Sequence, residues 1–191
     1  MASRVQIDGR TLWNWLRLIG WAGAVVLLML PLAAMQMEVP GVHWTLSDFL
    51  VMGALIGTCG LILELATRLS DNLAYRFGAA FAVAAAFLLI WINLAVGFLG
   101  DEDNPANLMF LPVIGVAIVG AVIGRARAGG MAQALVATAV AQVAAGIVAY
   151  GAGWASPGAQ GVSEVVVGTA LFTGLWLLSA FLFGRAAKAG A

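Results

Sequence analysis

Charged residues are scarce in this chain. Only 9% of its 191 residues are Asp, Glu, Lys or Arg, whereas 63% belong to the hydrophobic set. Soluble domains carry about 25% charged residues. A mean hydropathy of +1.01 leaves too few polar groups to cover a water-soluble globule. The composition excludes an ordinary soluble enzyme and a disordered segment, and it predicts an integral membrane protein.

The chain also has no excess of basic residues and only a single cysteine and a single histidine. Nine Lys and Arg are balanced by nine Asp and Glu, so no basic surface is predicted for nucleic acid. Cys59 and His43 are the only residues of their types, which excludes an internal disulfide and a metal site built from several Cys or His. No catalytic or nucleotide-binding motif stands out. The sequence favours a protein that is not an enzyme without deciding the question, and it leaves any cofactor open.

What the sequence does have is long apolar runs. A helix crosses the hydrocarbon core of a bilayer with about 20 residues, and these runs lack the polar–apolar alternation of barrel strands. We predict an all-α polytopic membrane protein, a single domain over residues 1–191 formed by a bundle of six transmembrane helices. The predicted spans are residues 12–35, 46–69, 73–99, 107–124, 131–154 and 163–183.

Local signals support several of these boundaries. Residues 45–48 (TLSD) form the pattern of a capping box at the start of the second span. Asn104 followed by Pro105 is typical of a helix N-terminus. Residues 163–164 are expected to cap the sixth span, and the glycines at 129–130 to separate the fourth from the fifth.

The distribution of charge predicts the orientation. With six spans, all nine basic residues fall on one side of the membrane, which the positive-inside rule places in the cytoplasm together with both termini. Alternatively, the first span could be a cleaved secretory signal, which would leave five spans in unchanged orientation. Its apolar run, residues 18–35, is longer than a usual signal core and favours a span.

Few polar residues lie within the spans, and each has two interpretations. Glu64 and Arg68 are four residues apart, as in a surface ion pair, but Glu64 also continues a face formed by Gly53, Gly57 and Gly60. On such a face it could relay protons or cations. Asn93 and Gln142 could bridge helices through hydrogen bonds or line a path for a ligand or ion.

The loop before the fourth span is the densest polar segment. Asp101, Glu102, Asp103 and Asn104 follow one another there. Carboxylates can attract a cation, but the spacing is not that of a calcium-binding loop. The favoured interpretation is a solvated turn whose acids stabilise a helix N-terminus, and no metal site is predicted.

One segment resembles a known group of proteins. Residues 91–109 (WINLAVGFLGDEDNPANLM) resemble a signature of small bacterial multi-span membrane proteins of unknown function, and residues 48–66 resemble the same group. The resemblance implies a bacterial inner membrane and no particular chemistry.

Three functions remain open from the sequence. The favoured one is an accessory or structural subunit, or a homo-oligomer, which packs against partners in the lipid bilayer through its glycine faces. The second is a small transporter or channel for an ion or solute that uses the intramembrane polar residues. A lipid-modifying enzyme is the weakest, because no nucleophile and base are paired in the sequence.

Overall fold

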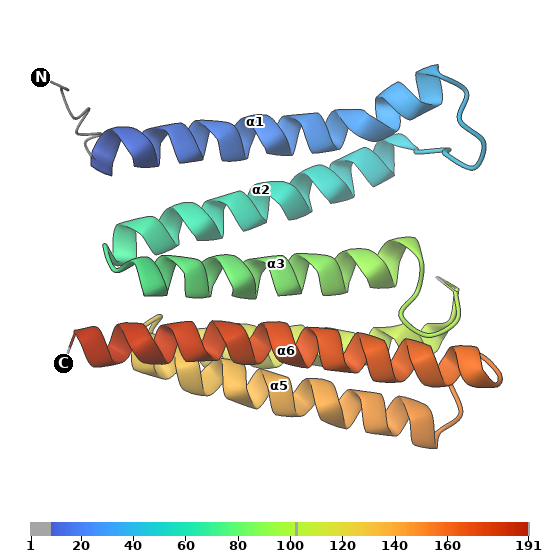
Figure 1. Ribbon diagram of the computed structural model, residues 1–191. Coiled ribbons are helices and arrows are strands. Elements are labelled where there is room, and N and C mark those ends of the chain that lie inside the picture. The colour runs from blue at the N-terminus through green and yellow to red at the C-terminus, as the bar shows by residue number, and fades with distance from the viewer. Residues whose placement is uncertain (1–8, 102, 191) are drawn as a thin grey trace, which may run out of the picture. The chain divides into compact units, whose positions relative to one another are not determined.

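All regular secondary structure is helical in the part that the computed structural model describes, residues 9–101 and 103–190 (Figure 1). The described helices are α1 (Gly9–Gln36), α2 (Leu46–Leu69), α3 (Leu73–Ala95), α4 (Leu111–Ile123), α5 (Ala128–Gly151) and α6 (Ala159–Ala189), with a 3₁₀ helix, η1 (Pro105–Phe110), before α4. Counting η1 and α4 together, six of these described segments are long and apolar enough to cross a membrane. The predicted all-helical class and the number of helices able to span a membrane are confirmed.

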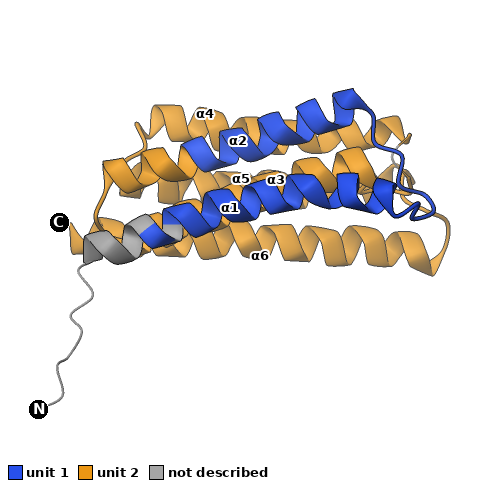
Figure 2. Cartoon of the chain, turned by 90° about the horizontal axis from the view of Figure 1, so that it is seen from above, with its two compact units in different colours: residues 1–61 blue, residues 62–191 orange. Residues whose placement is uncertain are grey.

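The chain divides into two compact units, residues 1–61 and 62–191 (Figure 2). The boundary falls inside α2. The first unit holds α1 and the larger part of α2, and the second holds the rest of α2 and all later helices. The prediction of one domain over residues 1–191 stays a prediction.

The second unit contains a packed core. Helix α6 lies against both α5 and α3, and α4 lies against α5. Neighbouring helices run in opposite directions (Figure 1). Large side chains that are almost wholly buried fill the space between them, and they include Trp176, Phe110, Phe172, Phe183 and Leu89.

Small residues let these helices approach closely. A Cβ atom added at Gly120 of α4 would lie 2.5 Å from the Cβ of Ala134 on α5. Gly78 of α3 faces the ring of Phe183 on α6, where an added Cβ would be 3.0 Å away. Lipid gives apolar helices no hydrophobic reason to associate, so such contacts stabilise the bundle through van der Waals packing.

The first unit is packed differently. Trp21 of α1 lies on Gly60 of α2, and Leu28 lies near Gly53, so the two helices are antiparallel with a constant register. The Trp21 ring, not a backbone, fills the space that Gly60 leaves. None of the side chains described between Trp15 and Leu61 is buried.

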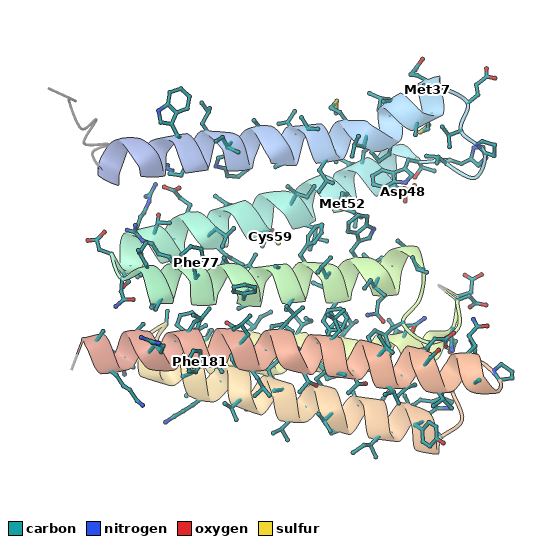
Figure 3. The ribbon with its side chains drawn as sticks, in the orientation of Figure 1. Met37, Asp48, Met52, Cys59, Phe77 and Phe181 are labelled. Atoms are coloured by element: carbon teal, nitrogen blue, oxygen red, sulfur yellow. The ribbon has the colours of Figure 1, made fainter. Side chains whose placement is uncertain are left out.

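The helix starts confirm two predicted caps. The Thr45 backbone N–H donates to Asp48 Oδ2 over 2.7 Å, and the Asp48 N–H donates back to Thr45 Oγ1 over 3.4 Å, which is the predicted capping box (Figure 3). Asn104 caps η1 by accepting a hydrogen bond from the Ala106 N–H over 3.0 Å. The sequence did not predict that the first turns after Pro105 are 3₁₀ and that α4 begins only at Leu111.

Two other predicted boundaries are wrong. Helix α6 begins at Ala159 after Gly158, whose φ of +73° favours glycine, so Ser163 lies inside the helix and donates to the Gln160 carbonyl. Gly129 and Gly130 do not separate helices but belong to the first turn of α5.

The third helix is shorter than predicted. It ends at Ala95, and Gly97, with a φ of +80°, turns the chain away from the helix axis. The apolar character of residues 96–99 predicts that they continue the span. Phe98 and Leu99 are instead buried as part of a folded loop.

Candidate functional site

A group of buried polar atoms without hydrogen-bond partners lies in the second unit. Within the described part of the chain these atoms come from α3, α5 and α6. They are Asn93 Oδ1, Gln142 Nε2, Gln142 Oε1, Thr169 Oγ1, Thr173 Oγ1 and Trp176 Nε1. A buried polar group left unpaired costs about 1–3 kcal/mol, so the presence of several such groups in one helical unit requires an explanation.

Gln142 is the most unusual member of the group. It lies near the middle of α5, it is 0% exposed, and neither its amide nitrogen nor its amide oxygen has a partner among the described atoms. The sequence named Gln142 as a candidate because a polar residue within a span is rare. The predicted bridge to another helix is not among the described hydrogen bonds.

The sequence did not point to the residues of α6 that carry unpaired buried atoms. Thr169, Thr173 and Trp176 are spaced four and three residues apart, which places them on one face of the helix. Thr169 packs directly against Gly146 of α5, where an added Cβ would overlap its hydroxyl. The helical spacing was visible in the sequence, but Thr and Trp are common enough in membrane helices that it did not stand out.

Two other buried polar residues nearby are satisfied. Thr138 Oγ1 donates to the Ala134 carbonyl of its own helix over 2.9 Å. Ser179 Oγ donates to the Gly78 carbonyl of α3 over 2.6 Å and so joins α6 to α3. Both side chains are 0% exposed, and their bonds show how a buried hydroxyl in this unit is ordinarily paired.

Asn93 belongs to a different helix, α3. It occupies the last turn of α3, two residues before the helix ends, and its Nδ2 donates to the Leu89 carbonyl over 2.6 Å. This bond is within one helix, so it does not bridge two. The sequence placed Asn93 deeper because it extended the third span to residue 99.

Glu64 and Arg68 form the predicted ion pair. Arg68 Nε and Nη2 donate to Glu64 Oε1 over 3.2 and 3.1 Å along the surface of α2. The Arg68 side chain is 71% exposed and that of Glu64 is 14% exposed. The pair has the geometry of an ordinary i,i+4 contact, and a proton or cation relay at Glu64 stays a prediction.

The loop before η1 is organised by two asparagines. Asn107, which is 4% exposed, accepts hydrogen bonds from the Phe98 and Leu99 N–H groups over 2.9 and 2.8 Å, and it donates to the Asp101 carbonyl over 2.7 Å. Asn104 Nδ2 donates to the carbonyls of Leu99 and Trp154. The sequence singled out Asn104 but gave Asn107 no role.

Glu164 also belongs to this loop structure. Its carboxylate accepts hydrogen bonds from the backbone N–H groups of Gly100 and Ser156, over 3.2 and 3.3 Å, and from Gln160 Nε2. The predicted role as a helix cap is therefore replaced by a link between two loops. The contact spans 64 residues of sequence, so no local pattern could have indicated it.

The described acidic side chains of the loop lie at the surface. Asp101 and Asp103 are exposed, and Glu102 lies outside the described residues. Within the described part of the chain no three His, Cys, Asp or Glu side chains are grouped to hold a metal ion. The loop is thus a folded element whose backbone is held by amides, with its described carboxylates at the surface.

Comparison of the chain with protein-family models, with curated proteins and with solved structures gives no match. The functional interpretation therefore rests on the residues and their geometry.

Proposed function

We propose that this chain is a non-catalytic integral protein of the bacterial inner membrane that acts by packing against other polypeptides. It serves either as an accessory subunit of a larger membrane complex or as a homo-oligomer. Both termini lie in the cytoplasm, as the one-sided distribution of basic residues favours.

The observation that carries this proposal is the lack of burial in the first unit. Its two helices are strongly apolar, yet none of their described side chains from Trp15 to Leu61 is buried. Within this unit, a Cβ added at Gly57 would meet no atom within 4 Å. In lipid, helices are held by close packing, so such a hairpin gains stability from a further protein surface.

Site-specific photocrosslinking in native membranes tests this role. A photoreactive amino acid replaces Leu50 of α2, which is 65% exposed, and Val140 of α5, which is 64% exposed, serves as the matched position. We expect an adduct heavier than one chain from position 50 and a weaker or absent one from position 140. Only lipid adducts at position 50 would contradict the packing role.

A small transporter or channel for an ion or solute is the second candidate. The unpaired amide of Gln142 in the middle of α5 favours it, because polar groups inside a membrane commonly mark substrate paths. Flux of potassium and of glycerol into proteoliposomes tests this candidate. Transport that is lost in Gln142→Leu and retained in Thr138→Val would support it, and the absence of flux in the native protein would contradict it.

A further inference from the structure

The packing of α5 against α6 places Gln142 of α5 at the level of Thr173 of α6. The two helices run side by side in opposite directions (Figure 1), and Gly146 packs against Thr169. One turn back along α5 reaches Gln142, and one turn forward along α6 reaches Thr173, so these two residues are level. Trp176 follows on the same face of α6, three residues after Thr173.

The hydrogen-bonding capacity of this group defines what could bind there. The Gln142 amide offers both donors and an acceptor, the Thr173 hydroxyl donates and accepts, and Trp176 Nε1 only donates. All of these atoms are buried and unpaired within the described structure. Because none of the three side chains carries a charge, a charged ligand would be left without compensation in a buried place.

We propose that Gln142, Thr173 and Trp176 form a binding site, within the helical unit, for a small uncharged molecule that both donates and accepts hydrogen bonds. Water has this chemistry, and so does a small hydroxylated or amide-bearing solute. A molecule of this kind would pair the amide, the hydroxyl and the indole N–H at once.

The neighbouring residues argue against an ordinary polar core. Thr138 lies one turn before Gln142 and bonds its own helix, and Ser179 lies three residues after Trp176 and bonds α3. The unit thus pairs the hydroxyls at one end of the group, whereas Gln142, Thr173, Trp176 and, at the other end, Thr169 have unpaired polar atoms. The binding site is independent of the packing role proposed above, since it lies wholly within the second unit.

Radiolytic footprinting of the full chain in lipid nanodiscs tests the site, with water as the probe. X-rays convert bound water to hydroxyl radicals, which oxidise side chains next to it. Trp176 is 0% exposed and should be oxidised only if water is bound beside it, whereas Phe183, which is 1% exposed, serves as the internal reference.

Two conservative variants form a matched pair. Thr173→Val removes an unpaired hydroxyl, and Thr138→Val removes one already bonded to its own helix. Loss of one hydrogen bond lowers the affinity for a bound molecule by about three- to tenfold. We therefore expect Thr173→Val, and Gln142→Leu as a second variant, to reduce Trp176 oxidation several-fold, and Thr138→Val to leave it unchanged.

The same measurement distinguishes water from a solute. If water occupies the site, Trp176 is oxidised strongly both before and after prolonged dialysis. If a solute from the membrane occupies it, oxidation is low at first, rises after dialysis and falls again when glycerol is added. Equal oxidation of Trp176 in the native protein and in all three variants, before and after dialysis, would overturn the assignment.

Discussion

At the scale of single residues, amide side chains organise the connections of the second unit. Asn72 caps α3 by accepting from the Ala74 and Tyr75 N–H groups, and Asn104 caps η1. Asn107 does more, because its one side chain pairs two buried backbone N–H groups and one carbonyl. Such a residue is hard to replace, since each group it pairs would otherwise be left unsatisfied.

Replacement of Asn107 is therefore expected to destabilise the protein strongly. Asn107→Ala leaves the Phe98 and Leu99 N–H groups without an acceptor and should lower the free energy of unfolding by about 2 kcal/mol or more. Asn107→Asp keeps an acceptor for these N–H groups, so its free energy of unfolding should fall by less. Thermal unfolding in detergent measures both, with the exposed Asp103→Ala as control; equal stability of Asn107→Ala and Asp103→Ala would contradict this role.

Local residue roles were predictable where the interaction is local. The capping box at Thr45 and Asp48 and the cap at Asn104 each join residues within three positions of one another. The roles of Glu164 and Asn107 were not predictable, because the first joins loops distant in sequence and the second depends on how the chain turns after Gly97.

At the scale of elements, the loop after α3 is anchored by one aromatic ring. Phe98 packs against Phe110 and Phe172, with ring centroids 4.1 and 5.9 Å apart, and its ring lies directly on Gly168 of α6. The ring is confined on all of these sides, so it cannot move aside cheaply. The sequence assigned this residue to a helix because it is apolar, whereas its place depends on α4 and α6.

Two glycines of α6 form a matched pair that tests this anchor. Gly168→Ala places a methyl group against the Phe98 ring and should destabilise by about 1–3 kcal/mol. Gly174→Ala meets no atom within 4 Å and should stabilise by up to about 1 kcal/mol. Chemical unfolding of both variants measures the difference, and a Gly168→Ala protein as stable as Gly174→Ala would show that the ring is free to move.

The packing of α4 on α5 allows a similar comparison. Gly120→Ala would bring a Cβ within 3.1 Å of the Ala134 Cα, so the helices must separate, and a loss of about 1–3 kcal/mol is expected. Gly115→Ala, in the same helix, meets nothing within 4 Å. In thermal unfolding, Gly120→Ala should have a lower unfolding temperature than Gly115→Ala. The reverse order would argue against a close approach of these helices.

At the scale of the whole molecule, composition and length predicted most of what the structure describes. Six apolar runs gave six helices because a run of this length has few other ways to satisfy its backbone in lipid. The division at residue 61 was not predictable, since both units are equally apolar in sequence. What distinguishes them is burial, which depends on contacts between distant helices.

The orientation can be tested on the full chain. The one-sided distribution of Arg and Lys predicts that both termini lie in the cytoplasm. A green fluorescent protein fused after residue 191 should therefore fluoresce, and alkaline phosphatase inserted in the loop at residues 152–158 should be active. An active phosphatase fused after residue 191 would contradict this topology.

The most direct measurement of the proposed role is the mass of the assembly released from native membranes in polymer-bounded lipid discs. One chain has a mass of 19.7 kDa. If the protein acts by packing against other polypeptides, the released particle contains more than one chain, either further copies or a partner in fixed ratio. A particle that holds a single 19.7 kDa chain and no other protein would contradict the packing role.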